Sequence, residues 1–104
     1  MANYIFSILK SNRMVMWSWG FSNPMAIANN DGLIFKVNGF KHKGFVKVLY
    51  NEGKDLFEVI LLDNRKMESH RIDDVYIDSL VDVIDGAVER TSDYAERVKN
   101  EYNN

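Results

Sequence analysis

Apolar and polar residues alternate with a period of two through the centre of the chain, which is the pattern of half-buried β-strands. Residues 33–37 form one such run, and Asn38-Gly39, which follows it, is a strong signal for a tight hairpin turn. A two-residue turn there places Val37 opposite Phe40, and the second strand of the hairpin then spans residues 40–50. The even-numbered residues of that strand are predicted to face the core.

The same alternation continues in residues 56–62, after a turn at Glu52-Gly53. A two-residue turn aligns this strand with the preceding one so that Lys47 lies opposite Glu58, and an opposite-charge pair of this kind favours the register. Residues 66–72 are mostly polar or charged, which is typical of a solvated edge strand.

The segment before the first hairpin is predicted to add a strand at residues 13–21. Four apolar side chains share one side of it at a spacing of two: Val15, Trp17, Trp19 and Phe21. Ser22-Asn23-Pro24 breaks the pattern, and residues 25–29 fit either a short strand or a helical turn. Asn30-Asp31-Gly32 signals a turn.

Both ends of the chain show helical spacing. Tyr4, Ile5, Ile8 and Leu9 predict a short helix that ends at Asn12. A second helix is predicted from about residue 74 to residue 98, with Asp73 or Asp74 as its cap and fraying over residues 99–104. Its apolar stripe consists of Ile77, Leu80, Val81, Ile84, Ala87 and Val88.

These elements predict one α+β domain spanning residues 1–104. We expect a mostly antiparallel sheet of four or five strands in meander order, with the C-terminal helix packed on one face and a short N-terminal helix beside it. A chain of 104 residues has the length of a single domain.

Composition and charge narrow the classes of function. The chain has 46% hydrophobic and 27% charged residues, no cysteine and a net charge of −2, which excludes a disulfide framework and argues against a general nucleic-acid binder. No apolar run is long enough to cross a bilayer, and the start of the chain lacks the basic residues of a signal peptide. We therefore expect a cytoplasmic protein that has no membrane partner.

The strongest functional hypothesis concerns the sheet face that points away from the C-terminal helix. Five apolar residues are predicted to gather there, and an apolar patch of this kind marks interfaces: Phe45, Leu49, Leu56, Ile60 and Leu62. The sequence therefore predicts a small interaction module that self-associates as a homo-oligomer or binds a protein partner, without catalysis.

An alternative is nucleic-acid binding through the lysine-rich hairpin, in which aromatic residues alternate with basic ones. Its candidate residues are Lys36, Lys41, Lys43 and Lys47. Residues 43–50 resemble the RNP1 motif of RNA-recognition domains except at Val46 and Lys47. That resemblance implies RNA bound on a sheet, but the chain has no room for the helix that the family places between its first two strands.

A third hypothesis is a small-ligand site or an enzyme active site near Trp17, Trp19 and His42. The chain has no phosphate-binding loop, no nucleophile elbow and no spacing typical of metal ligands. No catalytic residue, metal or cofactor is therefore predicted, and the sequence argues against an enzyme.

Overall fold

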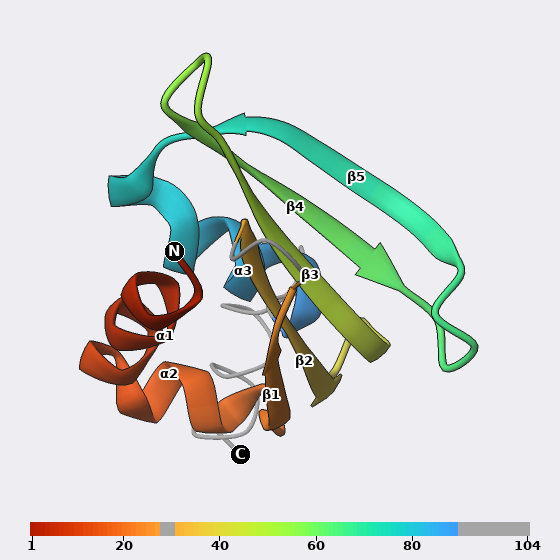
Figure 1. Cartoon of the computed structure of the whole chain (residues 1–104). Coiled ribbons are helices and arrows are strands. Elements are labelled where there is room, and N and C mark those ends of the chain that lie inside the picture. The colour runs from red at the N-terminus through yellow and green to blue at the C-terminus, as the bar shows by residue number, and fades with distance from the viewer. Residues whose placement is uncertain (28–30, 90–104) are drawn as a thin grey trace.

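The computed structural model describes residues 1–27 and 31–89 (Figure 1). Helices α1 and α2 come first, at Ala2–Ser11 and Arg13–Ser18. Five strands follow: β1 Ser22–Ala26, β2 Gly32–Asn38, β3 Lys43–Asn51, β4 Leu56–Leu62 and β5 Glu68–Val75. The short 3₁₀ helix η2 at Ile77–Ser79 leads into α3 at Leu80–Val88. The strands form one antiparallel sheet in the order β1-β2-β3-β4-β5, so the predicted α+β meander is confirmed.

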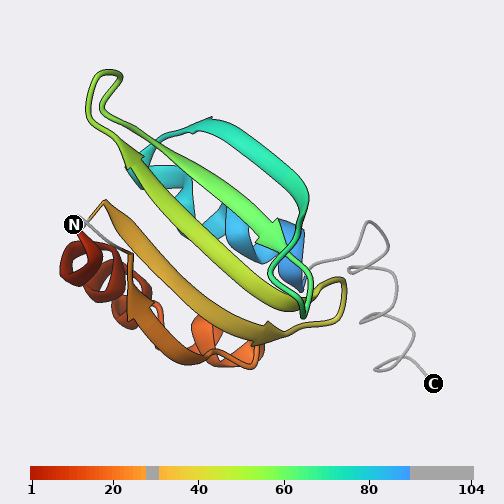
Figure 2. The same ribbon diagram turned by 45° about the vertical axis from the view of Figure 1, so that its right-hand side comes forward.

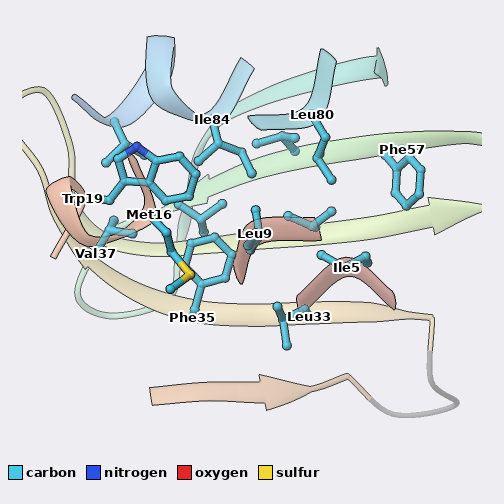
Figure 3. Packing of buried hydrophobic residues seen from close by; sticks show 14 of the residues in the cluster. Ile5, Leu9, Met16, Trp19, Leu33, Phe35, Val37, Phe57, Leu80 and Ile84 are labelled. Carbon is cyan, nitrogen blue, oxygen red and sulfur yellow. The ribbon is translucent and has the colours of Figure 1, made fainter. Parts of the chain in front are cut away.

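All three α-helices pack on the same face of the sheet, and the core lies between the two layers (Figure 3). From the helices it receives Ile5, Leu9, Met16, Trp19, Leu80, Ile84 and Val88. From the strands it receives Leu33, Phe35, Val37, Val46, Val48, Phe57, Val59, Leu61 and Val75. None of the described helices covers the opposite face, which is turned toward the viewer in Figure 2.

The N-terminal helix lies where its apolar spacing predicted it. Ile5 and Leu9, four residues apart, are completely buried, whereas the intervening Ser7 is exposed. Asn12 leaves the helical conformation and so separates α1 from α2.

The predicted strand at residues 13–21 is wrong, because residues 13–18 form α2. Met16 and Trp19 are buried three residues apart, which is helical spacing, while Trp17 is 63% exposed. Packing of the Trp19 indole into the core therefore overrides the strand preference of this aromatic segment. Gly20, with a φ of 68°, turns the chain into β1, an edge strand that contains Pro24.

The predicted pairing of the β2–β3 hairpin is also wrong, because Val37 lies opposite Gly44 and not opposite Phe40. Residues 39–42 form a longer loop that is fastened to the end of α3. The amides of Lys41 and His42 both donate to the Val88 carbonyl, at 2.8 and 3.2 Å. The register moves by an even number of residues, so the predicted core face of both strands is correct.

The β3–β4 pairing differs from the prediction by two residues. Lys47 lies opposite Ile60, and Glu58 lies opposite Leu49, so the predicted Lys47–Glu58 cross-strand pair does not form. The cause is a four-residue loop in which the Lys54 amide donates to Asn51 Oδ1 at 3.2 Å and Asp55 adopts a φ of 54°. The even shift again preserves which side chains face the core.

The polar edge strand is present as β5, and it extends farther than predicted. Asp73 and Asp74 belong to this strand and therefore do not cap the following helix, which contradicts that prediction. The helix begins instead through η2, and Leu80, Ile84 and Val88 of its predicted apolar stripe are buried. The predicted continuation of this helix to residue 98 is wrong, because α3 ends at Val88 and Glu89 leaves the helical conformation. The predicted fraying of residues 99–104 lies outside the described residues.

Candidate functional site

The sheet face that the helices leave uncovered is called here the outer face (Figure 2). Alternation along the strands determines which side chains lie on it, because neighbouring residues of a strand point to opposite faces. On β2 and β3 these are Ile34, Lys36, Lys43, Phe45, Lys47 and Leu49. On β4 and β5 they are Leu56, Glu58, Ile60, Leu62, Glu68 and Arg71.

The structure brings the five predicted interface residues together on the two adjacent strands β3 and β4. Phe45 lies directly opposite Leu62, and Leu49 is a diagonal cross-strand neighbour of Ile60 on the same face. Phe45, Leu49 and Leu56 are half-buried. Ile60 and Leu62 are only 1% and 5% exposed, yet neither belongs to the hydrophobic core on the helix side.

Charged side chains provide the cover over this apolar centre. Ile60 lies between Lys47 on one neighbouring strand and Arg71 on the other, and the long stems of such residues pack along apolar surface. The Lys66 ammonium lies 5.1 Å from the centre of the Phe45 ring. This cover consists of long charged side chains, and no described helix packs on this side of the sheet.

One end of the outer face is basic. Lys36 lies opposite Phe45, and Lys43 and Lys47 are two residues before and after it on the same strand. Lys66 adds a fourth lysine beside Phe45, and Glu68, which lies opposite Leu62 at the same end, is paired with Arg71. Among the residues that the structure describes, none of these four lysines forms an ion pair.

The other end of the outer face is acidic. A groove of about 380 Å³ opens there, lined by Asp31, Leu49, Tyr50, Asn51, Glu52 and Glu58. On the helix side of the same end, the Tyr50 hydroxyl donates to Asp55 Oδ1 at 2.6 Å, and this hydrogen bond raises the pKa of Tyr50 above its usual value of 10.0.

At the β5 edge of the outer face, carboxylates surround one cation. Arg71 contacts Glu68 at 3.1 Å, Glu58 at 3.2 Å and Asp73 at 3.9 Å. The hydrogen bond to Glu68, followed by the charge of that residue, raises the pKa of Arg71. Arg71 is therefore already paired with carboxylates, whereas within residues 1–27 and 31–89 no carboxylate forms an ion pair with the four lysines near Phe45.

The four lysines proposed for nucleic-acid binding do not all share this face. Lys36, Lys43 and Lys47 lie on it, but Lys41 lies on the helix side. There its ammonium donates to the Gly86 carbonyl at 2.6 Å, near the end of α3. Lys66, which sequence reasoning missed, occupies the place beside Phe45 because the β4–β5 turn carries it there.

The structure does not bring Trp17, Trp19 and His42 together. Trp19 is buried and its Nε1–H donates to Asp85 Oδ1 at 3.0 Å, whereas Trp17 points into solvent from the same helix. His42 Nε2 lies 3.0 Å from the Leu62 carbonyl oxygen, so this ring fastens the β2–β3 loop to the end of β4. Trp17, Trp19 and His42 therefore do not form a common site.

Neither a metal centre nor a spanning helix is found in the described parts of the chain. No group of three or more His, Asp or Glu side chains within residues 1–27 and 31–89 is arranged to hold a metal ion. Over the same residues no helix has the length and apolar character needed to cross a membrane.

The outer face is thus the surface on which exposed lysines, apolar side chains and carboxylates meet in a defined order. Comparison of the chain with protein-family models, with curated proteins and with solved structures finds no match.

Proposed function

We propose that the protein is a non-catalytic interaction module whose outer face binds the outer face of a second copy. The observation that best supports this is the distribution of charge over the apolar patch on β3 and β4: lysines lie near Phe45 at one end, and carboxylates lie near Leu49 at the other. A surface that carries both signs of charge on either side of an apolar centre can complement itself.

The charge order favours one way of pairing two copies. A two-fold axis that lies between the faces and crosses the strands places the basic end of each copy on the acidic end of the other. An axis along the strands would bring the two basic ends together, which is repulsive. We therefore expect each strand of one copy to run antiparallel to the same strand of the other copy, with the two sheets about 10 Å apart.

The apolar centre supplies the driving force for association. Complete burial of an exposed Leu or Phe side chain stabilises by about 1.5–3 kcal/mol. Phe45, Leu49 and Leu56 begin half-buried, so each contributes a part of that amount. The lysines must move aside at the same time, and the carboxylates of the second copy can then receive them.

The mass of the protein in solution tests the proposal. Sedimentation equilibrium over a range of concentrations is expected to show a reversible monomer–dimer equilibrium that shifts toward monomer in high salt, because salt screens the charged pairs. A monomer mass at every concentration would overturn the proposal.

Charge reversal at the two ends tests the two-fold arrangement. Lys43→Glu and Glu52→Lys both change exposed residues, so each variant is expected to fold and to remain monomeric on its own. A mixture of the two variants restores both sets of opposite charges and is expected to form a heterodimer. Lys10→Glu on α1, far from the outer face, is the matched control and should still form dimers.

A second candidate function is binding of single-stranded nucleic acid, which the four lysines near Phe45 support. Bases stack on aromatic rings while ammonium groups contact the phosphates. Fluorescence anisotropy with a labelled oligonucleotide is then expected to show steeply salt-dependent affinity that Lys36→Ala weakens. Lys41→Ala on the helix side is the control, and binding that both variants weaken equally would contradict this function.

A further inference from the structure

A groove of about 550 Å³ lies on the helix side of the sheet, where α3 passes over β4 and β5. This volume falls within the range of small-molecule sites, about 300–1,000 Å³. Apolar side chains from both layers form most of the lining: Leu61, Ile72, Val83 and Ala87. The sheet separates this groove from the outer face.

The groove runs along one flank of α3. Asp82, Val83, Gly86 and Ala87 line it, and their spacing of three to four residues places them on one side of the helix. The opposite flank carries Asp85, which is fastened to the indole of Trp19. On the groove side, α3 covers β4 and β5 incompletely and leaves Ile72 only half-buried.

Gly86 widens the groove without a conformational need for glycine. It lies inside α3, it has no positive φ, and a Cβ added there would meet no atom within 4 Å. Glycine in a helix interior lowers helix stability relative to alanine, so the residue is unfavourable for the helix itself. The missing side chain leaves open space in the wall of the groove. The Gly86 carbonyl accepts a hydrogen bond from the Lys41 ammonium at 2.6 Å.

The polar groups of the groove define the charge of a ligand. The Lys41 ammonium has three N–H donors and uses one of them for the Gly86 carbonyl, and His70 adds an exposed imidazole from β5. Asp82 lies one helical turn before Gly86, so the Lys41 end of the groove is a more favourable place for an anion than the Asp82 end.

We propose that this groove binds a small amphipathic carboxylate. Its carboxylate accepts hydrogen bonds from Lys41 and His70, and its hydrocarbon part lies along Leu61, Ile72 and Val83. This site is independent of the association proposed for the outer face, because the two surfaces lie on opposite sides of the sheet.

Titration of isotope-labelled protein with octanoate, followed by amide chemical shifts, tests the site. Saturable shifts are expected at Ile72, Gly86 and Ala87. Octanamide is the matched uncharged probe and is expected to bind about tenfold more weakly, because a hydrogen bond to a charged group is stronger than one to a neutral group. Equal affinity for the two probes, shifts confined to the outer face, or no saturable shifts would each overturn the proposal.

Three variants separate the parts of the site. Gly86→Leu fills the open space and is expected to abolish octanoate binding, while its thermal unfolding shows that the fold is kept. Lys41→Met is expected to remove the preference for octanoate over octanamide. Lys43→Met makes the same change of charge on the outer face and should leave octanoate binding unchanged. Undiminished binding by Gly86→Leu would contradict the assignment.

Discussion

Two tryptophans, two positions apart, have opposite surroundings in this molecule. Trp19 has no exposed surface, and its ring stacks on Phe35 with the centroids 6.4 Å apart (Figure 3). Its indole N–H donates to Asp85. Trp17 on the same helix is mostly exposed. Residue type alone does not distinguish them, because the partner of the buried indole lies 66 residues farther along the chain.

We expect Trp19→Phe to lower the free energy of unfolding by about 2–3 kcal/mol. The substitution removes a hydrogen bond to a carboxylate and leaves a space in the core. Urea denaturation measures the change, and Trp17→Phe is the matched control, expected to stay within about 0.5 kcal/mol of the wild type. Similar losses in both variants would show that the Trp19–Asp85 bond contributes little.

At the scale of the elements, periodicity predicted most helices and strands correctly, whereas strand pairing failed where loop geometry or a distant contact determines it. The α3 stripe and the central strands follow from spacing along the sequence. The pairing of β2 with β3 depends on amides that donate to Val88, and no rule based on Asn38-Gly39 contains that contact. For α2, burial of Trp19 overrides the local strand preference of the segment.

The β2–β3 loop is expected to be sensitive to any added side chain where it contacts α3. A Cβ at Gly39 would lie 2.4 Å from both the Val88 carbonyl oxygen and its Cγ1, so Gly39→Ala must displace the loop or the helix end. We expect it to lower the free energy of unfolding by about 1–3 kcal/mol.

Gly53→Ala in the β3–β4 loop is the matched control for Gly39→Ala. Its Cβ would meet only Asn51 Oδ1, at an ordinary contact distance of 3.5 Å. This change is expected to be neutral or to stabilise by up to about 1 kcal/mol, because alanine restricts the unfolded chain. A Gly39→Ala variant that is as stable as Gly53→Ala would show that the loop is not held firmly.

At the scale of the whole molecule, the sequence predicted which residues share the outer face but not the order of charge on it. Phe45 and Ile60 were placed on the same face correctly because the β3–β4 register error was even, but the residue opposite Phe45 is Leu62 and not Ile60. Lys41 was expected beside Lys43, and the docking of its loop on α3 carries it to the other side. Lys66 reaches Phe45 through the geometry of a turn that the alternation of residues does not encode.

Association through the outer face would make thermal stability depend on protein concentration. A partner that binds only the folded state stabilises that state by mass action. The midpoint of thermal unfolding of the wild type is therefore expected to rise with concentration, whereas that of Lys43→Glu stays constant. Calorimetry at several concentrations measures this, and a midpoint that is independent of concentration in both proteins would argue against the dimer.

The edges of the sheet bear on the size of any assembly. β1 carries Pro24, which has no amide hydrogen to offer a neighbouring strand, and β5 is lined with charged residues. Both features discourage another chain from adding as a sixth strand. Assembly by strand addition can continue indefinitely and produce fibres. A dimer with two-fold symmetry is closed, because each copy uses its only interface on the other. If the outer face pairs as proposed, these edges therefore favour dimers over larger polymers.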